Sequence, residues 1–134
     1  MVRPMGSDQD SERLVRDFCD AFVAHDAEAL RPFLADDVVY HNIPMDAVEG
    51  VDATIAFLAG FLAMCDKLEF DIRHLVARGD VVLTERVDTF TIGQVVAPLP
   101  VMGAFEITGG KISAWRDYFD MAQVTKLFAS EGAG

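Results

Sequence analysis

Apolar residues recur every three or four positions in the first half of the chain and alternate with polar residues in much of the second half. Over Asp8–His25 this spacing places a stripe of apolar side chains on one face of an amphipathic helix: Leu14, Val15, Phe18, Ala21 and Phe22. Asp26 is suited to cap a second, shorter helix over Ala27–Leu34. A third helix is predicted from Gly50 to Met64.

Strand-like segments occupy most of the chain after Met64. They alternate or run apolar, and short turns that contain glycine separate them: Leu68–Ala77, Val81–Ile92, Val95–Ile107 and Ile112–Phe119. A brief strand, Asp37–Asn42, precedes the third helix. Helices followed by a long antiparallel meander are typical of an α+β fold. We therefore predict a curved mixed or antiparallel sheet, with the N-terminal helices packed on one face, enclosing a conical pocket.

Local features refine this picture. Pro98 and Pro100 interrupt the Val95–Ile107 strand, which predicts either a sheet edge or a bulge there. A last short helix is predicted over Met121–Phe128. Residues 1–7 and 130–134 are expected to be mobile ends around a single domain over residues 8–129.

The composition narrows the class of protein. A chain of 134 residues, 51% of them hydrophobic, is enough for one domain with a single core. The formal net charge of −11 argues against nucleic acid and membrane surfaces as partners, because both favour a basic patch. Residues 1–10 lack the apolar segment of a signal peptide, so a cytoplasmic location is expected. The cysteines and histidines show no metal-ligand spacing, and we expect neither a metal nor a cofactor.

Charged residues stand among apolar neighbours on two of the predicted strands. Arg86 and Asp88 are two positions apart and therefore point to the same face of their strand. Asp117 shares a face with Trp115 and Phe119 in the same way. If these faces meet, one guanidinium lies between two carboxylates in an apolar cavity. Burying such a set costs roughly several kcal/mol per ion unless it is well paired, so it needs a reason beyond stability.

This constellation suits acid–base chemistry. A lone Arg-x-Asp pair on a strand is usually a structural ion pair, but Tyr40 and Asn42 present further polar groups on a third strand. One carboxylate can accept a proton from a positioned water, while a second carboxyl, kept protonated by burial, donates to a leaving oxygen. Two carboxylates beside one arginine are expected to retain one proton and to titrate as a coupled unit.

Four strings resemble the limonene-1,2-epoxide hydrolase family: residues 40–42 (YHN), 83–88 (LTERVD), 103–105 (GAF) and 109–120 (GGKISAWRDYFD). The resemblance implies an NTF2-like, SnoaL-like fold of the cystatin-like superfamily. It implies one-step addition of water to a hydrophobic, cyclic terpene-like epoxide, giving a vicinal diol without a cofactor or a covalent enzyme ester. The family's enzymes are typically homodimers, so a homodimer is expected here.

The resemblance also implies a role for each polar residue. Asp117 would be the base that deprotonates water, and Tyr40 and Asn42 would hold that water. Asp88 would be the acid that protonates the epoxide oxygen, and Arg86 would bridge both aspartates.

Apolar residues are expected to line the substrate pocket: Phe61, Met64, Phe90, Leu99, Val101 and Phe119. The segment Val95–Val101, with its two prolines, differs more from the limonene enzyme than the rest, so the substrate need not be limonene oxide.

Two other functions fit the same scaffold. A ketosteroid-isomerase-like or polyketide-cyclase-like enzyme needs a base and an oxyanion donor, but no arginine bridging two carboxylates. A non-catalytic module that binds a lipophilic ligand leaves the buried carboxylates unexplained.

Overall fold

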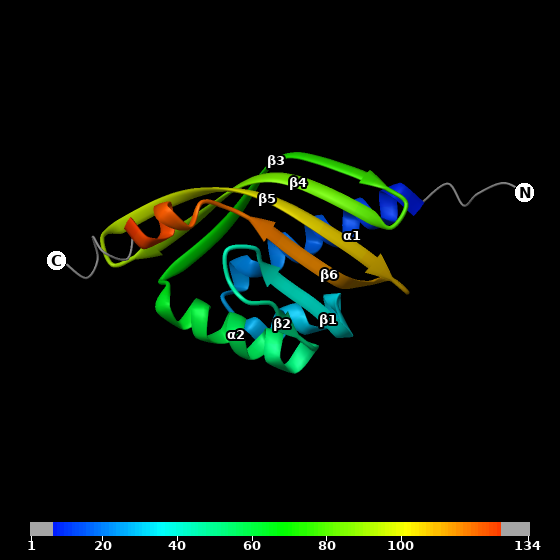
Figure 1. Cartoon of the computed structure of the whole chain (residues 1–134), viewed down its shortest axis with the longest axis horizontal. Coiled ribbons are helices and arrows are strands. Elements are labelled where there is room, and N and C mark those ends of the chain that lie inside the picture. Colours follow the sequence, from blue (N-terminus) through cyan, green and yellow to red (C-terminus); the bar gives the residue numbers. More distant parts are fainter. Residues whose placement is uncertain (1–6, 127–134) are drawn as a thin grey trace, which may run out of the picture.

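The computed structural model describes residues 7–126, and its helices precede most of its sheet (Figure 1). Helix α1 spans Ser7–Ala21 and α2 spans Val51–Met64. Two 3₁₀ segments, Phe22–Ala24 and Ala27–Phe33, follow α1. No helix in the described part of the chain is long and apolar enough to cross a membrane.

The six strands within residues 7–126 belong to one sheet, with the order β2-β1-β6-β5-β4-β3. Strands β1 and β6 run parallel, and every other neighbouring pair is antiparallel. The bounds of the strands are Leu34–Asn42 (β1), Val48–Glu49 (β2), Lys67–Arg78 (β3), Val81–Ile92 (β4), Val95–Thr108 (β5) and Lys111–Tyr118 (β6). The predicted α+β class with a curved mixed sheet is therefore confirmed.

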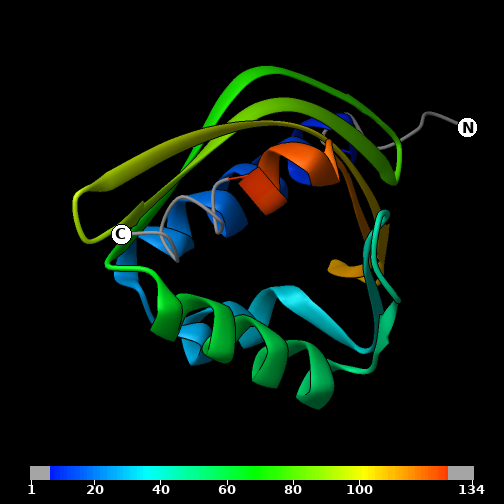
Figure 2. The same ribbon diagram turned by 60° about the vertical axis from the view of Figure 1, so that its left-hand side comes forward.

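The sheet bends around the helices, and bulges coincide with this curvature (Figure 2). The pairing of β3 with β4 gains one residue between Ile72 and His74, and the pairing of β1 with β6 shifts between Leu34 and Val39. An extra residue on one strand increases the local twist and bends that strand. Helix α1 packs against β3 and β4, while α2 packs against β1 and β2.

Aromatic rings form the centre of the core. Phe18 of α1 lies edge-on to Trp115 of β6, with ring centroids 5.0 Å apart, and edge-on to Phe22 at 5.4 Å. Trp115, Phe18, Phe22 and Phe105 are almost completely buried. Such edge-to-face pairs add roughly 0.5–1.5 kcal/mol each beyond the burial of their area. The packing fixes α1 across the inner face of the sheet.

Several predicted boundaries differ from the structure at the N-terminal side. The first helix does not continue to His25, because the chain tightens into a 3₁₀ turn and His25 takes a left-handed conformation (φ 56°). Ser7 is helical rather than part of a mobile end, and the first strand begins earlier than predicted, at Leu34. The two-residue strand β2 was not predicted; such a short strand carries no readable alternation.

The remaining predictions concern the C-terminal part. Residues 121–126 are helical, as predicted, whereas residues 1–6 and 127–134 lie outside the described residues. This leaves the proposed ends of the domain as predictions. Pro98 and Pro100 pair only with β4, because the pairing of β5 with β6 begins at Met102. The prolines therefore lie at a local edge of the sheet, and the irregularity in the pairing of β5 lies elsewhere, where β6 carries one extra residue, Ser113, between the partners of Glu106 and Ile107.

Candidate active site

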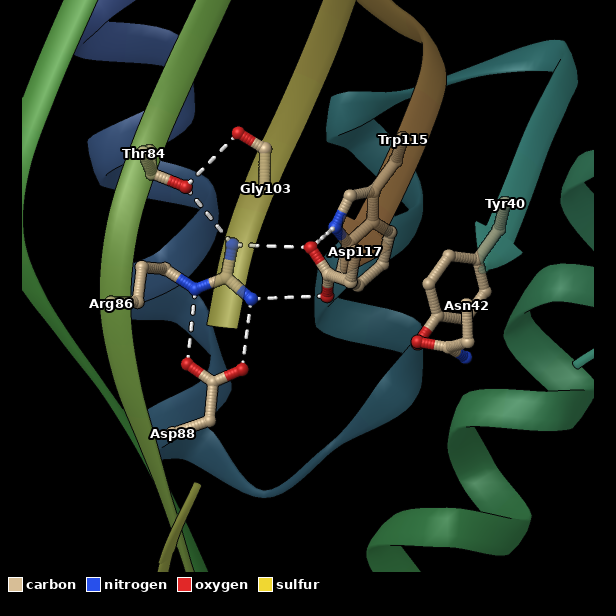
Figure 3. A network of polar contacts seen from close by, with 8 residues as sticks. All are labelled: Tyr40, Asn42, Thr84, Arg86, Asp88, Gly103, Trp115 and Asp117. Carbon is tan, nitrogen blue, oxygen red and sulfur yellow. Dashed lines mark hydrogen bonds and ion pairs between the residues drawn. The ribbon is translucent and has the colours of Figure 1, made fainter. Parts of the chain in front are cut away.

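Polar residues of three strands lie in one row across the sheet, with a glycine of a fourth strand between them. Thr84 of β4 is directly opposite Gly103 of β5, which is opposite Asp117 of β6. Asn42 of β1 completes the row as the partner of Asp117. Arg86 lies two residues after Thr84 on β4, opposite Val101, and its guanidinium reaches toward Asp117 (Figure 3). Residues from β1, β4 and β6 thus meet although they are far apart in the sequence.

The guanidinium of Arg86 uses all five of its N–H donors. Nε and Nη2 donate to the two carboxylate oxygens of Asp88, at 3.0 and 2.8 Å. Nη1 and Nη2 donate to Oδ1 and Oδ2 of Asp117, at 3.2 and 3.0 Å, and Nη1 also donates to Thr84 Oγ1 at 3.1 Å. The Phe70 ring covers the guanidinium, with its centroid 4.7 Å from Cζ. This complete pairing is what a buried charge requires.

Burial strongly affects the protonation of the cluster formed by Arg86, Asp88 and Asp117. The side chain of Arg86 is 0% exposed and those of Asp88 and Asp117 are 6% exposed. Burial raises the pKa of Asp88 to about 6, although the hydrogen bonds and charge of Arg86 oppose the shift. Burial also disfavours the charge of Arg86, but the two carboxylates outweigh it and keep its pKa well above the ordinary value. With both carboxylates ionised the cluster carries −1, so Asp88 holds a proton more readily than an exposed aspartate.

Tyr40 and Asn42 lie beside the ion-paired cluster. Tyr40 Oη donates a hydrogen bond to Asn42 Oδ1 at 3.2 Å, and the Tyr40 ring stacks on Trp115 with centroids 4.0 Å apart. Burial raises the pKa of the Tyr40 phenol far above its usual range, so the hydroxyl stays neutral. The amide NH₂ of Asn42 is then available as a donor, next to Asp117.

Gly103 provides the space that the guanidinium occupies. A Cβ atom at this position would overlap Arg86 Nη1, and would lie 2.8 Å from Thr84 Oγ1 and 2.9 Å from Asp117 Oδ1. Any residue other than glycine therefore forces the arginine or one of its partners to move. The glycine is required by a close approach of side chains rather than by an unusual backbone angle.

An apolar cavity of about 840 Å³ opens onto this polar row. Tyr40, Asn42, Asp88 and Asp117 form part of its wall, whereas Arg86 does not. The six apolar residues expected from the sequence all line it: Phe61, Met64, Phe90, Leu99, Val101 and Phe119. The volume lies in the upper part of the range for sites that bind drug-sized ligands.

Sequence reasoning missed several residues of the site. Thr84 could have been found, because it shares the strand face of Arg86. The contacts of Gly103 and Phe70 depend on strand register, for which the sequence carries no local signal. Met121, Val124 and Thr125 line the cavity from the last described helical residues. His74 is exposed and pairs with Glu85 at 2.7 Å, away from the cavity. Within residues 7–126 no group of His, Cys, Asp or Glu side chains is arranged to hold a metal ion.

The role of Gly103 leads to a prediction about stability. Gly103→Ala is expected to lower the free energy of unfolding by about 1–3 kcal/mol, the range for overpacked positions. Urea unfolding followed by circular dichroism measures this change. Gly60→Ala on α2 is the matched control: its Cβ meets nothing within 4 Å, and alanine is favoured over glycine in a helix by about 0.5–1 kcal/mol. If Gly103→Ala leaves the urea concentration at the midpoint of unfolding unchanged, the guanidinium of Arg86 can move aside.

Comparison with known proteins shows that the fold and much of the sequence are shared. The family model of the limonene-1,2-epoxide hydrolase catalytic domain matches residues 9–129. Epoxide hydrolase EphG of Mycobacterium tuberculosis (strain ATCC 25618 / H37Rv) is 34% identical over 112 residues, which cover 84% of this chain and 74% of that protein. The solved structure of an LEH-like epoxide hydrolase of M. tuberculosis superimposes with a TM-score of 0.80 at 32% identity, covering 90% of each chain.

More distant structures share the architecture. A protein with a ketosteroid isomerase-like fold from Catenulispora acidiphila DSM 44928 matches with a TM-score of 0.77 at 20% identity, covering 85% of this chain and 90% of that one. Identity at this level supports the NTF2-like fold alone, and the family rests on the match over residues 9–129 and on the relative at 34% identity. The chain belongs to the limonene-1,2-epoxide hydrolase family.

Proposed function

We propose that the protein is an epoxide hydrolase that adds water to a hydrophobic, cyclic terpene-like epoxide and forms a vicinal diol. The observation that carries this proposal is the pair of buried carboxylates that share one guanidinium at the wall of an apolar cavity. One carboxyl that keeps a proton and one carboxylate that accepts one are the two groups that epoxide opening by water needs. Membership of the family, and a relative that is named an epoxide hydrolase, support the same reaction.

Asp117 is the base in this proposal. The attacking water donates one hydrogen bond to Asp117 and accepts one from the amide of Asn42, with the hydroxyl oxygen of Tyr40 as a further acceptor. As the water oxygen bonds to an epoxide carbon, Asp117 takes the proton that the water loses. Tyr40 is held in place by its stacking on Trp115, so the position of the water is set before the substrate binds.

Asp88 is the acid. It donates its proton to the epoxide oxygen as the carbon–oxygen bond breaks, so no alkoxide is released into the apolar cavity. After one turnover the proton of the pair is on Asp117 and Asp88 is ionised. The pair holds the same number of protons as before, and transfer through solvent water resets it after the diol leaves. Arg86 contacts both carboxylates throughout and limits the repulsion between them.

The substrate is bound by aromatic and aliphatic walls. Phe57 and Phe61 of α2 and Phe90 of β4 line the cavity, and Phe61 and Phe90 meet edge-on with centroids 5.3 Å apart. Such a surface favours a ring-containing hydrocarbon with few polar groups, because it offers few hydrogen-bond partners away from the polar row.

Turnover of a panel of cyclic epoxides in oxygen-18 water tests the proposed reaction. Label is expected in one carbon–oxygen bond of the diol, with none left on the enzyme after a single turnover. Asp88→Asn and Asp117→Asn are each expected to lower kcat by about 10²- to 10⁴-fold, the usual contribution of a general acid or base. The matched control is Asp71→Asn, which changes an exposed aspartate of β3. Near-normal turnover in either buried variant would exclude the mechanism, and no diol from any substrate would favour an isomerase-like or ligand-binding role.

The raised pKa of Asp88 predicts how activity depends on pH. The acid must be protonated, so kcat/KM is expected to fall about tenfold per unit as pH rises beyond the pKa of about 6. A bound apolar substrate excludes water and raises this pKa further, so the inflection of kcat lies at higher pH than that of kcat/KM. Rate profiles from pH 4 to 9 measure both. His41→Ala and His74→Ala are expected to leave the inflections in place, and a lost inflection in either variant would contradict the assignment.

We also propose that two copies of the chain associate through the outer face of the sheet. Exposed apolar side chains from four strands lie together there: Val76, Leu83, Met102 and Tyr118, which are 48–66% exposed. Register places Val76 opposite Leu83 and Met102 opposite Tyr118. Ion pairs of Arg116 with Glu106 and of His74 with Glu85 lie on the same face, so the surface carries charges of both signs that a second copy can complement.

Light scattering coupled to size-exclusion chromatography tests this association. The wild-type chain is expected to have the mass of a dimer, and Leu83→Glu is expected to give a monomer, because it buries an unpaired charge in the interface. Val96→Glu, at a position 63% exposed near the β4–β5 turn, is the control and should remain dimeric. A monomeric wild type, or a dimer that tolerates Leu83→Glu, would contradict the proposed interface.

A further inference from the structure

The indole of Trp115 contacts both Asp117 of the ion-paired cluster and Tyr40 beside that cluster (Figure 3). Its Nε1–H donates a hydrogen bond to Asp117 Oδ1 at 2.9 Å, and its ring stacks on Tyr40 at an interplanar angle of 21°. Trp115 is completely buried and does not form part of the cavity wall. It therefore acts on the reaction through Asp117 and Tyr40 rather than by touching the substrate.

The direction of this N–H bond is fixed by packing. Tyr40 comes from β1 and Phe105 from β5, the two strands that flank β6, so the indole lies between their rings. Phe18 of α1 closes the edge at a centroid distance of 5.0 Å and an angle of 89°. A ring enclosed in this way has no room to rotate, and its donor points at one oxygen of Asp117.

The hydrogen bonds distinguish the two oxygens of Asp117. Oδ1 accepts from Trp115 Nε1 and from Arg86 Nη1, which occupies both of its lone pairs. Oδ2 accepts only from Arg86 Nη2 among the described residues, so one lone pair is left. Oδ2 is therefore the oxygen that can receive a proton from water, and it is held in one orientation.

The number of hydrogen bonds that each carboxylate accepts also distinguishes Asp117 from Asp88. Asp117 accepts three hydrogen bonds, while Asp88 accepts two, both from Arg86, within residues 7–126. Donors to a carboxylate favour its charged form, so the extra donor favours the negative charge on Asp117 and leaves the shared proton on Asp88.

From this geometry we infer that Trp115 is a positioning residue that decides which aspartate is the base and which of its oxygens receives the proton. The inference rests on the proposed function, since the two roles have meaning only for a reaction that uses both aspartates.

Among the described residues, few titratable groups face Asp117. Arg86 and Asp88 come from β4, Tyr40 from β1 and Cys19 from α1. Burial raises the pKa of the Cys19 thiol to about 12 and that of Tyr40 further still, so both stay neutral over the working range of pH. The residues of α2 and of 121–126 that line the cavity carry no charge. The proton distribution is thus controlled by the two aspartates, Arg86 and the indole donor.

The kinetic test removes the donor and keeps an aromatic ring. Trp115→Phe is expected to lower kcat about tenfold or more, the worth of one hydrogen bond to a charged group, with KM little changed. The loss is expected in kcat because the donor acts on the base and not on the bound substrate. An unchanged kcat would overturn the inference.

Phe105→Leu is the matched control, because Phe105 stacks on the same indole at 6.0 Å but donates nothing to the site. It is expected to lower stability while changing kcat much less than Trp115→Phe does. An equal loss of kcat in both variants would assign Trp115 a packing role only. If Trp115→Phe does not fold, replacing Trp115 with 3-benzothienylalanine removes the N–H while preserving the shape of the indole, and the same two outcomes apply.

A spectroscopic measurement separates this inference from the proposed function. Trp115 is the only tryptophan of the chain, so ¹⁵N-labelled indole gives one N–H resonance. Its chemical shift is expected to titrate with the aspartate pair, and Asp117→Asn is expected to abolish that dependence. This result requires no substrate, and it would stand even if no epoxide were turned over. A resonance that does not respond to pH or to Asp117→Asn would overturn the inference.

Discussion

The burial of Arg86 between two aspartates is the constraint on which the rest of the site depends. Transferring three charged groups out of water is costly, and the cost is offset only when every donor and most lone pairs are satisfied. The structure meets this demand with the five N–H groups of Arg86, two carboxylates, Thr84 and the face of Phe70. Each partner comes from a position that the strand register must place within a few ångströms. The ion-paired cluster therefore forms only when β3 to β6 pair in this register.

In the proposed reaction, the unequal surroundings of the two aspartates make one of them the acid and the other the base. Among residues 7–126, Asp88 accepts hydrogen bonds from Arg86 alone, whereas Asp117 accepts them from Arg86 and from the indole of Trp115. Burial raises the pKa of Asp88 to about 6, which is the direction required of a group that must donate a proton near neutral pH. If the two aspartates had the same surroundings, they would share the proton equally, and half of the molecules would hold it on Asp117 instead of Asp88.

The core and the site are not separate regions of this protein. Trp115 packs with Phe18 and Phe105 as a core residue, while its N–H and its contact with Tyr40 belong to the site. Helix α1 therefore supports the chemistry although its residues do not line the main cavity. Precise placement of reacting groups is obtained from the same close packing that stabilises the fold.

The sequence by itself determined which side chains share a face, because side chains on a strand alternate with a period of two. This was enough to group Arg86 with Asp88, to align Asp117 with Trp115, and to predict an α+β fold. Only the tertiary structure decided that β1 runs parallel beside β6 and that Gly103 leaves room for the guanidinium. These features depend on pairing between strands far apart in the chain and on space that neighbouring side chains compete for, and no local pattern encodes either.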